Sequence, residues 1–403
     1  MLPKIHIFPF SLKYLMVLSL CLTSCRYEGH GQRLTAKDTA VQSQLRLGAE
    51  RMEVYLSLLK GKKVALVVNH TSMVGHIHLV DTLLSRGIQV EKIFAPEHGF
   101  RGTADAGEHV QNERDKQTLI PIVSLYGKNK KPRPGHLQDI DVVVFDMQDV
   151  GARFYTYIST MHYVMEACAE QGKEIIILDR PNPNGDYIDG PVLDPQFRSF
   201  VGMHPIPVVH GLTVGELAQM IAGERWIQAA DSCKLTVVKM ENYKHSMRYE
   251  PPVRPSPNLP NYHAIRWYPT LCLFEGTAMS VGRGTDFPFQ VVGYPHPGMG
   301  SFRFTPHPNM GAKHPLYEGK TCYGLDLRKQ APPAYLAIEY IIDFYNRFPD
   351  KQQFFNRYFD TLCGTDQVRK QIEAGKSAAE IRRQWAKDLE KYKQLRAKYV
   401  IYD

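Results

Sequence analysis

The chain has 403 residues, of which 43% are hydrophobic and 22% are charged, and its formal net charge is +8. A chain of this length and hydrophobic content can bury a large core in two or three domains, and its ordinary charged fraction argues against extensive disorder. The positive charge is mild, and the sequence has neither a long run of Lys or Arg nor a nucleic-acid-binding motif, so we expect no nucleic-acid partner.

The N-terminus has the pattern of a secretory signal. Lys4 and Lys13 precede the apolar run YLMVLSLCL, which is too short to anchor a protein stably across a bilayer. The run leads into Leu-Thr-Ser-Cys, ending at Cys25, which resembles a bacterial lipobox; the alternative is an ordinary signal peptide with an incidental Cys. We predict a lipoprotein signal peptide over residues 1–25, lipidation of Cys25 and a polar tether over 26–45. The protein would then be exported and lipid-anchored to the bacterial cell envelope, in the periplasm or at the outer membrane.

Four apolar runs in the first half of the chain lead directly into polar side chains. The run KVALVVNH leads into Asn69 and His70, and VEKIFAPEHG leads into Glu97 and His98. The run DVVVFDMQD leads into Asp146, Gln148 and Asp149, and EIIILDRPNPNG leads into Asp179 and Arg180. Apolar runs separated by helical segments are typical of buried parallel strands, whose carboxyl ends lie along one edge of the sheet, where ligands bind. We therefore expect these side chains to meet at one cleft and predict an enzyme with acid–base chemistry.

The alternation of strand and helix patterns continues to TVGELAQMIAGERWI, in which Thr213 and Glu216 have the spacing of a capping box. This alternation predicts a doubly wound, Rossmann-like α/β domain over residues 46–228. The rest of the chain combines strand patterns, Gly turns, a Pro-rich segment and helical patterns, which predicts a smaller α+β domain over residues 229–403.

Glu97 is the strongest candidate for a catalytic residue. It follows an apolar strand and stands between Pro96 and His98. A carboxyl group at such a position is partly desolvated, which raises its pKa and suits a general acid. The alternative is a structural Glu that caps N–H groups of the following loop. We predict the catalytic role.

Other carboxylates also follow strand or turn patterns. Asp146 and Asp149 follow a strand, and Arg153 lies on the next turn, so these Asp residues are candidates either for acid–base chemistry or for an Asp–Arg pair that braces the loop. Glu275 in LFEGTAMS and Asp286 in GRGTDFP either face the cleft or belong to turns.

The sequence offers little support for a metal or a cofactor. His70, His98 and His210 could bind a metal with Asp146 or Asp179, but no pair of them has the spacing of metal ligands. There is also no Cys-x-x-Cys pair, no GxSxG elbow, no Walker loop and no HExxH motif. We predict neither a metal site nor a cofactor.

Several long strings occur together: VVNHTS, FAPEHGFRG, FDMQDVGARFYTYI, LDRPNPNG, VHGLTVGE, SPNLP, LFEGT and SVGRGTDFPF. Together they resemble the exo-β-N-acetylmuramidase family of glycoside hydrolases, over nearly all of the chain after the tether. The resemblance implies a Rossmann-like N-terminal domain, an auxiliary C-terminal domain and an active-site cleft between them. It also implies release of N-acetylmuramic acid from the non-reducing end of peptidoglycan fragments. The family's proposed catalytic glutamate lies in a Glu-His-Gly motif, which here is Glu97-His98-Gly99.

This chemistry needs a proton donor, a second supporting group and a site for an anionic sugar. Muramic acid carries a lactyl carboxylate, so we expect an Arg in the sugar site, and Tyr rings could stack on the sugar. The predicted catalytic residues are Glu97, His98, Asp146 and Glu275. The predicted substrate-binding residues are Asn69, His70, Arg101, Gln148, Arg153, Tyr155, Tyr157, Asp179, Arg180, His210 and Arg283.

Two other functions stay open at this point. One is a metal-dependent peptidoglycan amidase or deacetylase, which a chelator would inactivate. The other is a muropeptide-binding lipoprotein that binds its ligand without cutting it.

Overall fold

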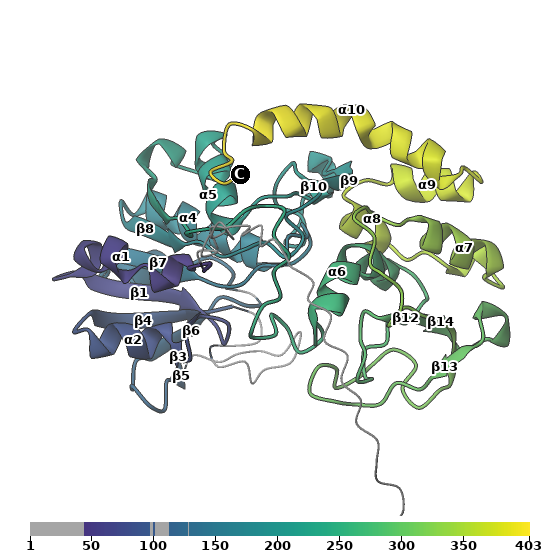
Figure 1. The fold of residues 1–403 in the computed structure, drawn as a ribbon, viewed down its shortest axis with the longest axis horizontal. Helices are drawn as coiled ribbons and strands as arrows, with labels where there is room; N and C mark the ends of the chain where they lie inside the picture. Colours follow the sequence, from purple (N-terminus) through teal and green to yellow (C-terminus); the bar gives the residue numbers. More distant parts are fainter. Residues whose placement is uncertain (1–43, 97–99, 101–112, 128) are drawn as a thin grey trace, which may run out of the picture. The chain divides into compact units, whose positions relative to one another are not determined.

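A seven-stranded sheet carries most of the first half of the chain (Figure 1). Its strands are β1 (Lys63–Val68), β4 (Gln89–Ala95), β5 (Glu113–Arg114), β6 (Pro121–Ser124), β7 (Val142–Asp146), β8 (Glu174–Leu178) and β11 (Lys234–Val238). The order is β11-β8-β7-β1-β4-β6-β5, and all neighbours are parallel except β5 and β6. Taken in chain order, the parallel strands occupy the positions 3-2-1-4-5-6 of a Rossmann-like sheet, as predicted.

The computed structural model describes residues 44–96, 100, 113–127 and 129–403. The part of the chain from Gln44 to Asp403 forms one unit. Cys25, the predicted signal peptide and the tether as far as residue 43 lie outside the described residues, as do Glu97, His98 and Arg101.

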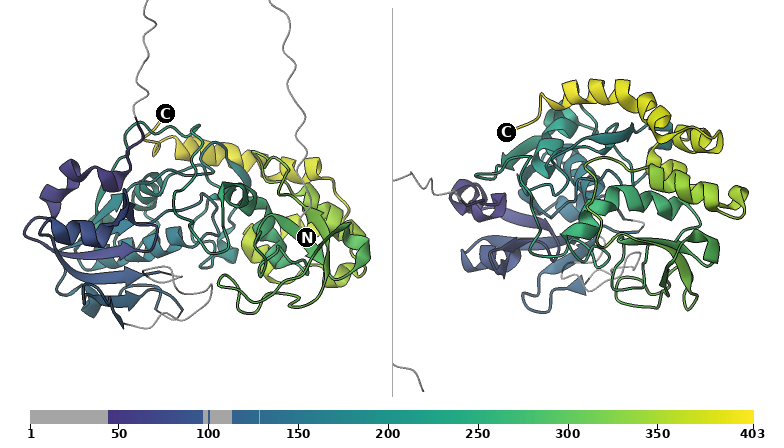
Figure 2. Two further views of the ribbon diagram at one scale, coloured as in Figure 1. Left: turned by 60° about the horizontal axis from the view of Figure 1, so that its bottom comes forward. Right: turned by 45° about the vertical axis from the view of Figure 1, so that its right-hand side comes forward.

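Helices cover both faces of the sheet (Figure 2). The side chains of a strand point alternately to opposite faces, and along β7 Val142 and Val144 pack in one apolar cluster while Val143 and Phe145 pack in another. The first cluster includes residues of α1 (Met52–Leu59) and α2 (Leu79–Ser85), and the second includes residues of α3 (Pro134–Leu137), α4 (Tyr157–Glu170) and α5 (Val214–Gly223). Burial on both faces explains why these strands are apolar throughout.

The predicted capping box at the start of α5 is confirmed. Thr213 Oγ1 accepts a hydrogen bond from the N–H of Glu216 (3.2 Å), and the N–H of Thr213 donates to Glu216 Oε2 (2.9 Å). Each side chain satisfies an N–H group that would otherwise lack a partner at the first turn, so the helix begins at Val214.

The sheet extends beyond residue 228, where the first domain is predicted to end. β11 pairs in parallel with β8, and its Leu235 and Val237 lie opposite Ile175 and Ile177. The N–H and C=O groups along the edge of β8 would have no strand partner without β11.

The second half of the chain combines helices with a small antiparallel sheet in the order β12-β14-β13. Its strands are β12 (Val291–Tyr294), β13 (Phe302–Phe304) and β14 (Cys322–Asp326), and its helices are α6 (Tyr262–Leu271), α7 (Glu339–Arg347), α8 (Tyr358–Cys363), α9 (Gln367–Glu373) and α10 (Ala378–Arg396). Two hairpins belong to the first half, β2 (Met73–Val74) with β3 (Ile77–His78) and β9 (Asp189–Val192) with β10 (Pro207–Val209). The short 3₁₀ helices are η1 (Gly48–Glu50), η2 (Pro195–Phe197), η3 (Ala230–Ser232), η4 (Cys272–Gly276), η5 (Pro297–Met299) and η6 (Lys351–Gln353).

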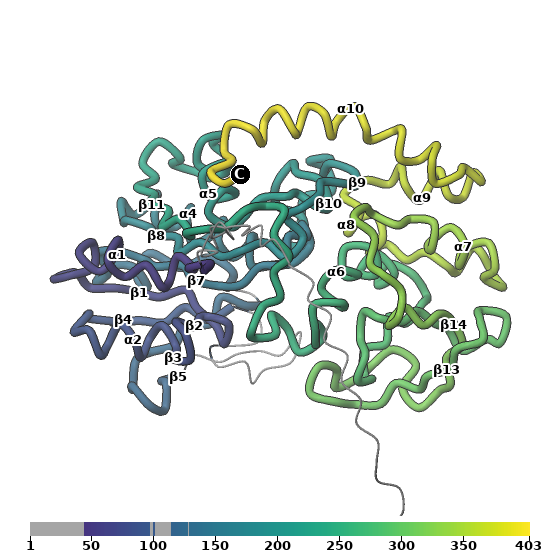
Figure 3. Tube along the Cα trace, in the orientation of Figure 1, coloured from purple at the N-terminus to yellow at the C-terminus, as the bar shows by residue number. Residues whose placement is uncertain are grey.

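After α10 the chain returns to the Rossmann-like sheet and ends beside α5 (Figure 3). The hydroxyl of Tyr392 donates to the carbonyl of His210 and that of Tyr402 donates to Asp179 Oδ2, each at 2.7 Å. The C-terminal segment therefore contributes to the packing of the first half. In the part of the chain that the structure describes, no helix has both the length and the hydropathy of a bilayer-spanning segment.

Candidate active site

The ends of β1 and β7 meet where the strand order reverses, which is the usual ligand site of such sheets. Here side chains hold the two strand ends together. Thr71 Oγ1 donates to Asn69 Oδ1 (2.6 Å) and accepts from the N–H of Gln148 (3.0 Å). Asn69 and Gln148 are both buried, so these two predicted substrate-binding residues brace the sheet edge.

Asp146 and Arg180 form a buried, two-point ion pair at the same edge. Arg180 Nε lies 2.5 Å from Asp146 Oδ1 and Arg180 Nη2 lies 2.8 Å from Oδ2. The two residues are 0% and 3% exposed. Burial lowers the pKa of Arg180, but the carboxylate of Asp146 more than offsets this, so the pKa lies above its ordinary value. Both oxygens of Asp146 are therefore occupied, while Arg180 lines a small pocket of about 60 Å³.

Asp179 serves as an internal acceptor for helix α5. Its Oδ1 accepts from the N–H of Gly215 (2.8 Å), and its Oδ2 accepts from Thr213 Oγ1 and from the hydroxyl of Tyr402 (both 2.7 Å). Burial raises the pKa of Asp179 to about 6. Both oxygens of the Asp179 carboxylate therefore have hydrogen-bond partners within the protein.

Arg153 donates to four main-chain carbonyls. Its Nη1 binds the carbonyls of Pro191 (2.8 Å) and Ile206 (2.7 Å), and its Nη2 binds those of Leu362 (3.0 Å) and Cys363 (2.6 Å). Burial lowers the pKa of this fully buried Arg to about 10. Arg153 thus joins the β9–β10 region to the end of α8.

Asp149 and His210 are also buried. Asp149 Oδ2 accepts from the N–H of Gly151 (2.6 Å), and burial raises the pKa of Asp149 to about 7. His210 Nδ1 accepts from the N–H of Leu212 (3.2 Å), and burial lowers the pKa of His210 to about 3, which keeps the ring neutral. The alternative pairing of Asp146 or Asp149 with Arg153 does not form, because each group has other partners.

A pocket of about 220 Å³, the Glu275 pocket, brings together four predicted site residues from distant parts of the sequence. They are Tyr155, Tyr157, Glu275 and Arg283. Arg283 Nε lies 2.5 Å from Glu275 Oε1, and the two side chains are 29% and 24% exposed. Burial raises the pKa of Tyr155 well above its ordinary value, so this phenol stays neutral. The pocket thus combines a solvent-accessible ion pair with aromatic walls.

A larger pocket of about 520 Å³, the His70 pocket, is lined by His70 from the end of β1 and by Asp286 from the second half. Ser256 and Asn258 line both this pocket and the Glu275 pocket. His70 thus reaches a pocket, whereas its neighbour Asn69 is buried.

The strand that leads to His70 neighbours the strand that leads to Glu97 in the sequence. β1 pairs with β4, with Val67 opposite Phe94, and only Pro96 separates β4 from Glu97 in the sequence. The sequence predicts that the strand-end residues meet at one cleft. His70 lines a pocket, whereas Asp146 and Asp179 are bound by partners within the protein.

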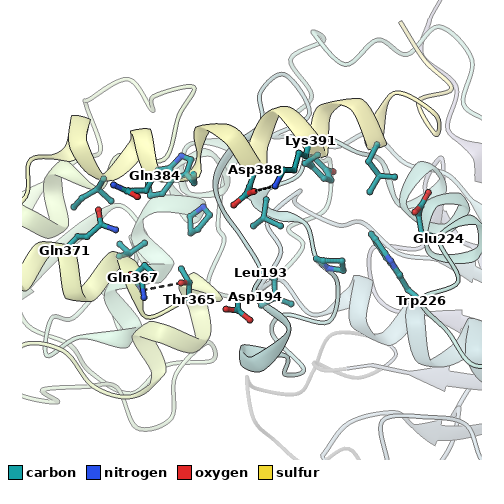
Figure 4. A pocket seen from close by; sticks show the side chains of 18 residues that line it. Leu193, Asp194, Glu224, Trp226, Thr365, Gln367, Gln371, Gln384, Asp388 and Lys391 are labelled. Carbon is teal, nitrogen blue, oxygen red and sulfur yellow. Dashed lines mark hydrogen bonds and ion pairs between the residues drawn. The ribbon is translucent and has the colours of Figure 1, made fainter.

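A further pocket, of about 610 Å³, is lined by none of the predicted site residues. It lies under α10, with Asp388 and Lys391 above it and Trp226 at one side (Figure 4). Within residues 44–96, 113–127 and 129–403, no three His, Cys, Asp or Glu side chains gather as a metal ion would require.

The exo-β-N-acetylmuramidase NamZ family model for the N-terminal domain matches residues 64–263, and that for the C-terminal domain matches residues 266–402. The chain belongs to this family. A NamZ relative, the peptidoglycan β-N-acetylmuramidase of Bacillus subtilis (strain 168), is 37% identical, and the alignment covers 98% of this chain and 99% of the relative.

Two crystal structures of DUF1343 family proteins from Bacteroides fragilis NCTC 9343 resemble this NamZ family chain. One is 45% identical with a TM-score of 0.83 and covers 90% of this chain and 99% of its own. The other is 30% identical with a TM-score of 0.76 and covers 89% of this chain and 99% of its own. The fold described here is therefore also found in these solved structures.

Three residues outside the predicted site set line a pocket of this NamZ family chain: Arg254, Ser256 and Asn258. They lie in the Pro-rich segment that contains SPNLP. Asn258 is buried and its Nδ2 donates to the carbonyl of Gly311 (2.6 Å). A polar residue that stands between prolines in a motif string is the sequence feature that could have identified them.

Proposed function

We propose that the chain is an exo-acting glycosidase that releases N-acetylmuramic acid from the non-reducing end of peptidoglycan fragments. The observation that carries this proposal is the NamZ family match over both halves, together with 37% identity to a peptidoglycan β-N-acetylmuramidase over 98% of the chain. Neither an amidase or deacetylase nor a non-catalytic binding protein has support in these comparisons.

The active site is proposed to lie in a cleft between the Rossmann-like part and an auxiliary C-terminal part. Support comes from the two adjoining pockets, each lined by side chains of both halves. His70 and Asp286 line one, and Tyr155 and Glu275 line the other.

Glycoside hydrolysis needs a group that protonates the leaving oxygen and a second group that supports the oxocarbenium-like centre. We assign the first role to Glu97 because it follows β4 in the sequence. β4 pairs with β1, the strand that leads to His70. For the second role Glu275 is favoured over Asp146. Glu275 lines a pocket and is partly exposed, whereas Asp146 is fully buried and bound by Arg180.

The proposed function predicts a strong preference for an anionic sugar. With an aryl β-N-acetylmuramide and the matching β-N-acetylglucosaminide, kcat/KM should be at least about tenfold higher for the muramide, because a desolvated guanidinium–carboxylate pair discriminates against the neutral analogue. The same assay with a chelator should show unchanged activity. Equal kcat/KM for the two sugars, or inactivation by the chelator, would contradict the proposal.

We also propose that the protein is exported and held at the cell envelope by lipid on Cys25. The basic residues, short apolar run and Leu-Thr-Ser-Cys string motivate this. Cys25→Ala should move the protein from the membrane fraction to the soluble fraction without loss of muramidase activity. Cys233→Ala, which changes a half-buried thiol far along the chain, is the matched control and should remain with membranes. Wild-type protein found free of membranes after export would refute the anchor.

A further inference from the structure

Residues of the Rossmann-like half fix the main chain of a short Pro-rich segment at the His70 pocket. His70 Nε2 lies 2.7 Å from the carbonyl oxygen of Arg254. The hydroxyls of Tyr155 and Tyr157 both donate to the carbonyl of Pro255, at 2.7 Å and 3.2 Å. Three side chains from two separate segments thus hold two consecutive peptide groups.

The sequence around Arg254 adds local stiffness. Pro255 follows it directly, which restricts Arg254 to an extended conformation, and prolines also stand at positions 251, 252 and 257. Tyr155 and Tyr157 are themselves buried, with their rings edge to face at a centroid distance of 4.8 Å. The backbone of Arg254 is therefore placed before any ligand binds, which lowers the entropy lost when its side chain makes a contact.

The side chain of Arg254 differs from the other arginines beside the motifs that the structure describes. Arg153 is committed to main-chain carbonyls, Arg180 to Asp146 and Arg283 to Glu275. Arg254 is exposed and, among the described residues that line the His70 pocket, it is the only Lys or Arg. No ion pair joins it to another described residue.

The chemistry of the proposed substrate needs such a group. N-acetylmuramic acid differs from N-acetylglucosamine by a lactyl ether that carries a carboxylate, and a guanidinium binds a carboxylate through two parallel hydrogen bonds. A pocket of about 520 Å³ is in the range of small-molecule sites. We propose that Arg254 is the specificity-determining residue that binds the lactyl carboxylate, and that His70, Tyr155 and Tyr157 are positioning residues for it. This inference rests on the proposed function and assigns its sugar preference to one side chain.

Arg254→Gln tests the assignment with the aryl muramide and the matching aryl glucosaminide. For the muramide kcat/KM should fall about 10- to 100-fold, since a charge-assisted pair is lost, while the value for the glucosaminide should stay at the wild-type level. Arg254→Lys keeps the charge but not the two-point geometry and should fall in between. Arg248→Gln, at an exposed Arg outside the pocket, is the matched control and should behave as wild type.

Inhibition by the free sugars gives a second measure that does not depend on glucosaminide turnover. N-acetylmuramic acid should inhibit wild type more strongly than N-acetylglucosamine does, and Arg254→Gln should remove this difference. Tyr155→Phe, which deletes the hydroxyl that holds Pro255, should lower the muramide-to-glucosaminide ratio in a folded enzyme. An unchanged ratio in Arg254→Gln, or equal losses on both sugars, would overturn the assignment. Wild-type enzyme that cleaved neither sugar would instead refute the proposed function.

Discussion

Glu97→Gln is expected to lower turnover of a natural muramic-acid-containing disaccharide about 10²–10⁴-fold, the usual contribution of general acid catalysis. The amide keeps the shape of the side chain but cannot supply the proton that a sugar hydroxyl needs in order to leave. An aryl muramide with a good phenolate leaving group departs with little protonation, so its loss should be much smaller. The measurement is kcat for both substrates with the purified wild-type and variant enzymes.

The comparison of leaving groups distinguishes the possible roles of Glu97. Glu91→Gln makes the same chemical change on β4, at a carboxylate that accepts a hydrogen bond from nearby Gln89, and should leave both rates unchanged. Near-wild-type turnover of the disaccharide by Glu97→Gln would rule out the general acid, and Glu275 would be tested next. An equally large loss on both substrates would indicate a nucleophile or an electrostatic stabiliser instead.

Arg180→Met is expected to destabilise the fold by about 3–5 kcal/mol, because it leaves the carboxylate of Asp146 buried without its partner. The double variant Asp146→Leu, Arg180→Met removes both charges and should recover most of this loss, since paired burial of charges contributes little net stability. The free energy of unfolding, from urea titrations of each purified variant, measures the effect.

An exposed ion pair provides the control for this experiment. Arg225 and Asp231 are paired on the surface with side chains 67% and 74% exposed, so Arg225→Met should change the unfolding free energy little. A small effect of Arg180→Met, or a double variant as unstable as the single one, would show that the buried pair is not a structural support. The comparison also separates stability from activity, because Arg180 lines only the smallest of the pockets described above.

The strand-end residues show how far sequence reasoning reaches. Apolar runs predicted the strands that became β1, β4, β7 and β8, and the parallel order placed their carboxyl ends along one edge. The sequence could not say which side chains at that edge would remain accessible. Asn69 and His70 are consecutive, yet Asn69 is buried against Thr71 while His70 lines a pocket. The chain turns at these residues, where the N–H of Ser72 donates to the carbonyl of Asn69 (3.0 Å), so the two neighbouring side chains have different surroundings.

The roles of the charged residues depend on partners that are far away in the sequence. Arg153 looks like a ligand-binding arginine beside a motif, but the carbonyls that it binds come from the β9–β10 region and from the end of α8. Asp179 looks like a cleft carboxylate, but Tyr402, near the C-terminus, donates to it. A buried charge must find partners, and which groups arrive is decided by packing.

The sequence by itself determined the Rossmann-like sheet, the capping box of α5 and the NamZ family, because each depends on short-range periodicity or on contiguous strings. Only the tertiary structure decided that β11 completes the sheet, that Arg180 rather than Arg153 pairs with Asp146, and that Arg254 lines the His70 pocket. These outcomes depend on contacts between segments 34 to more than 180 residues apart, such as Asp146 with Arg180 and His70 with Arg254. Local patterns set which elements form, whereas the burial of charge and the packing of distant loops set which side chains are left to meet a substrate.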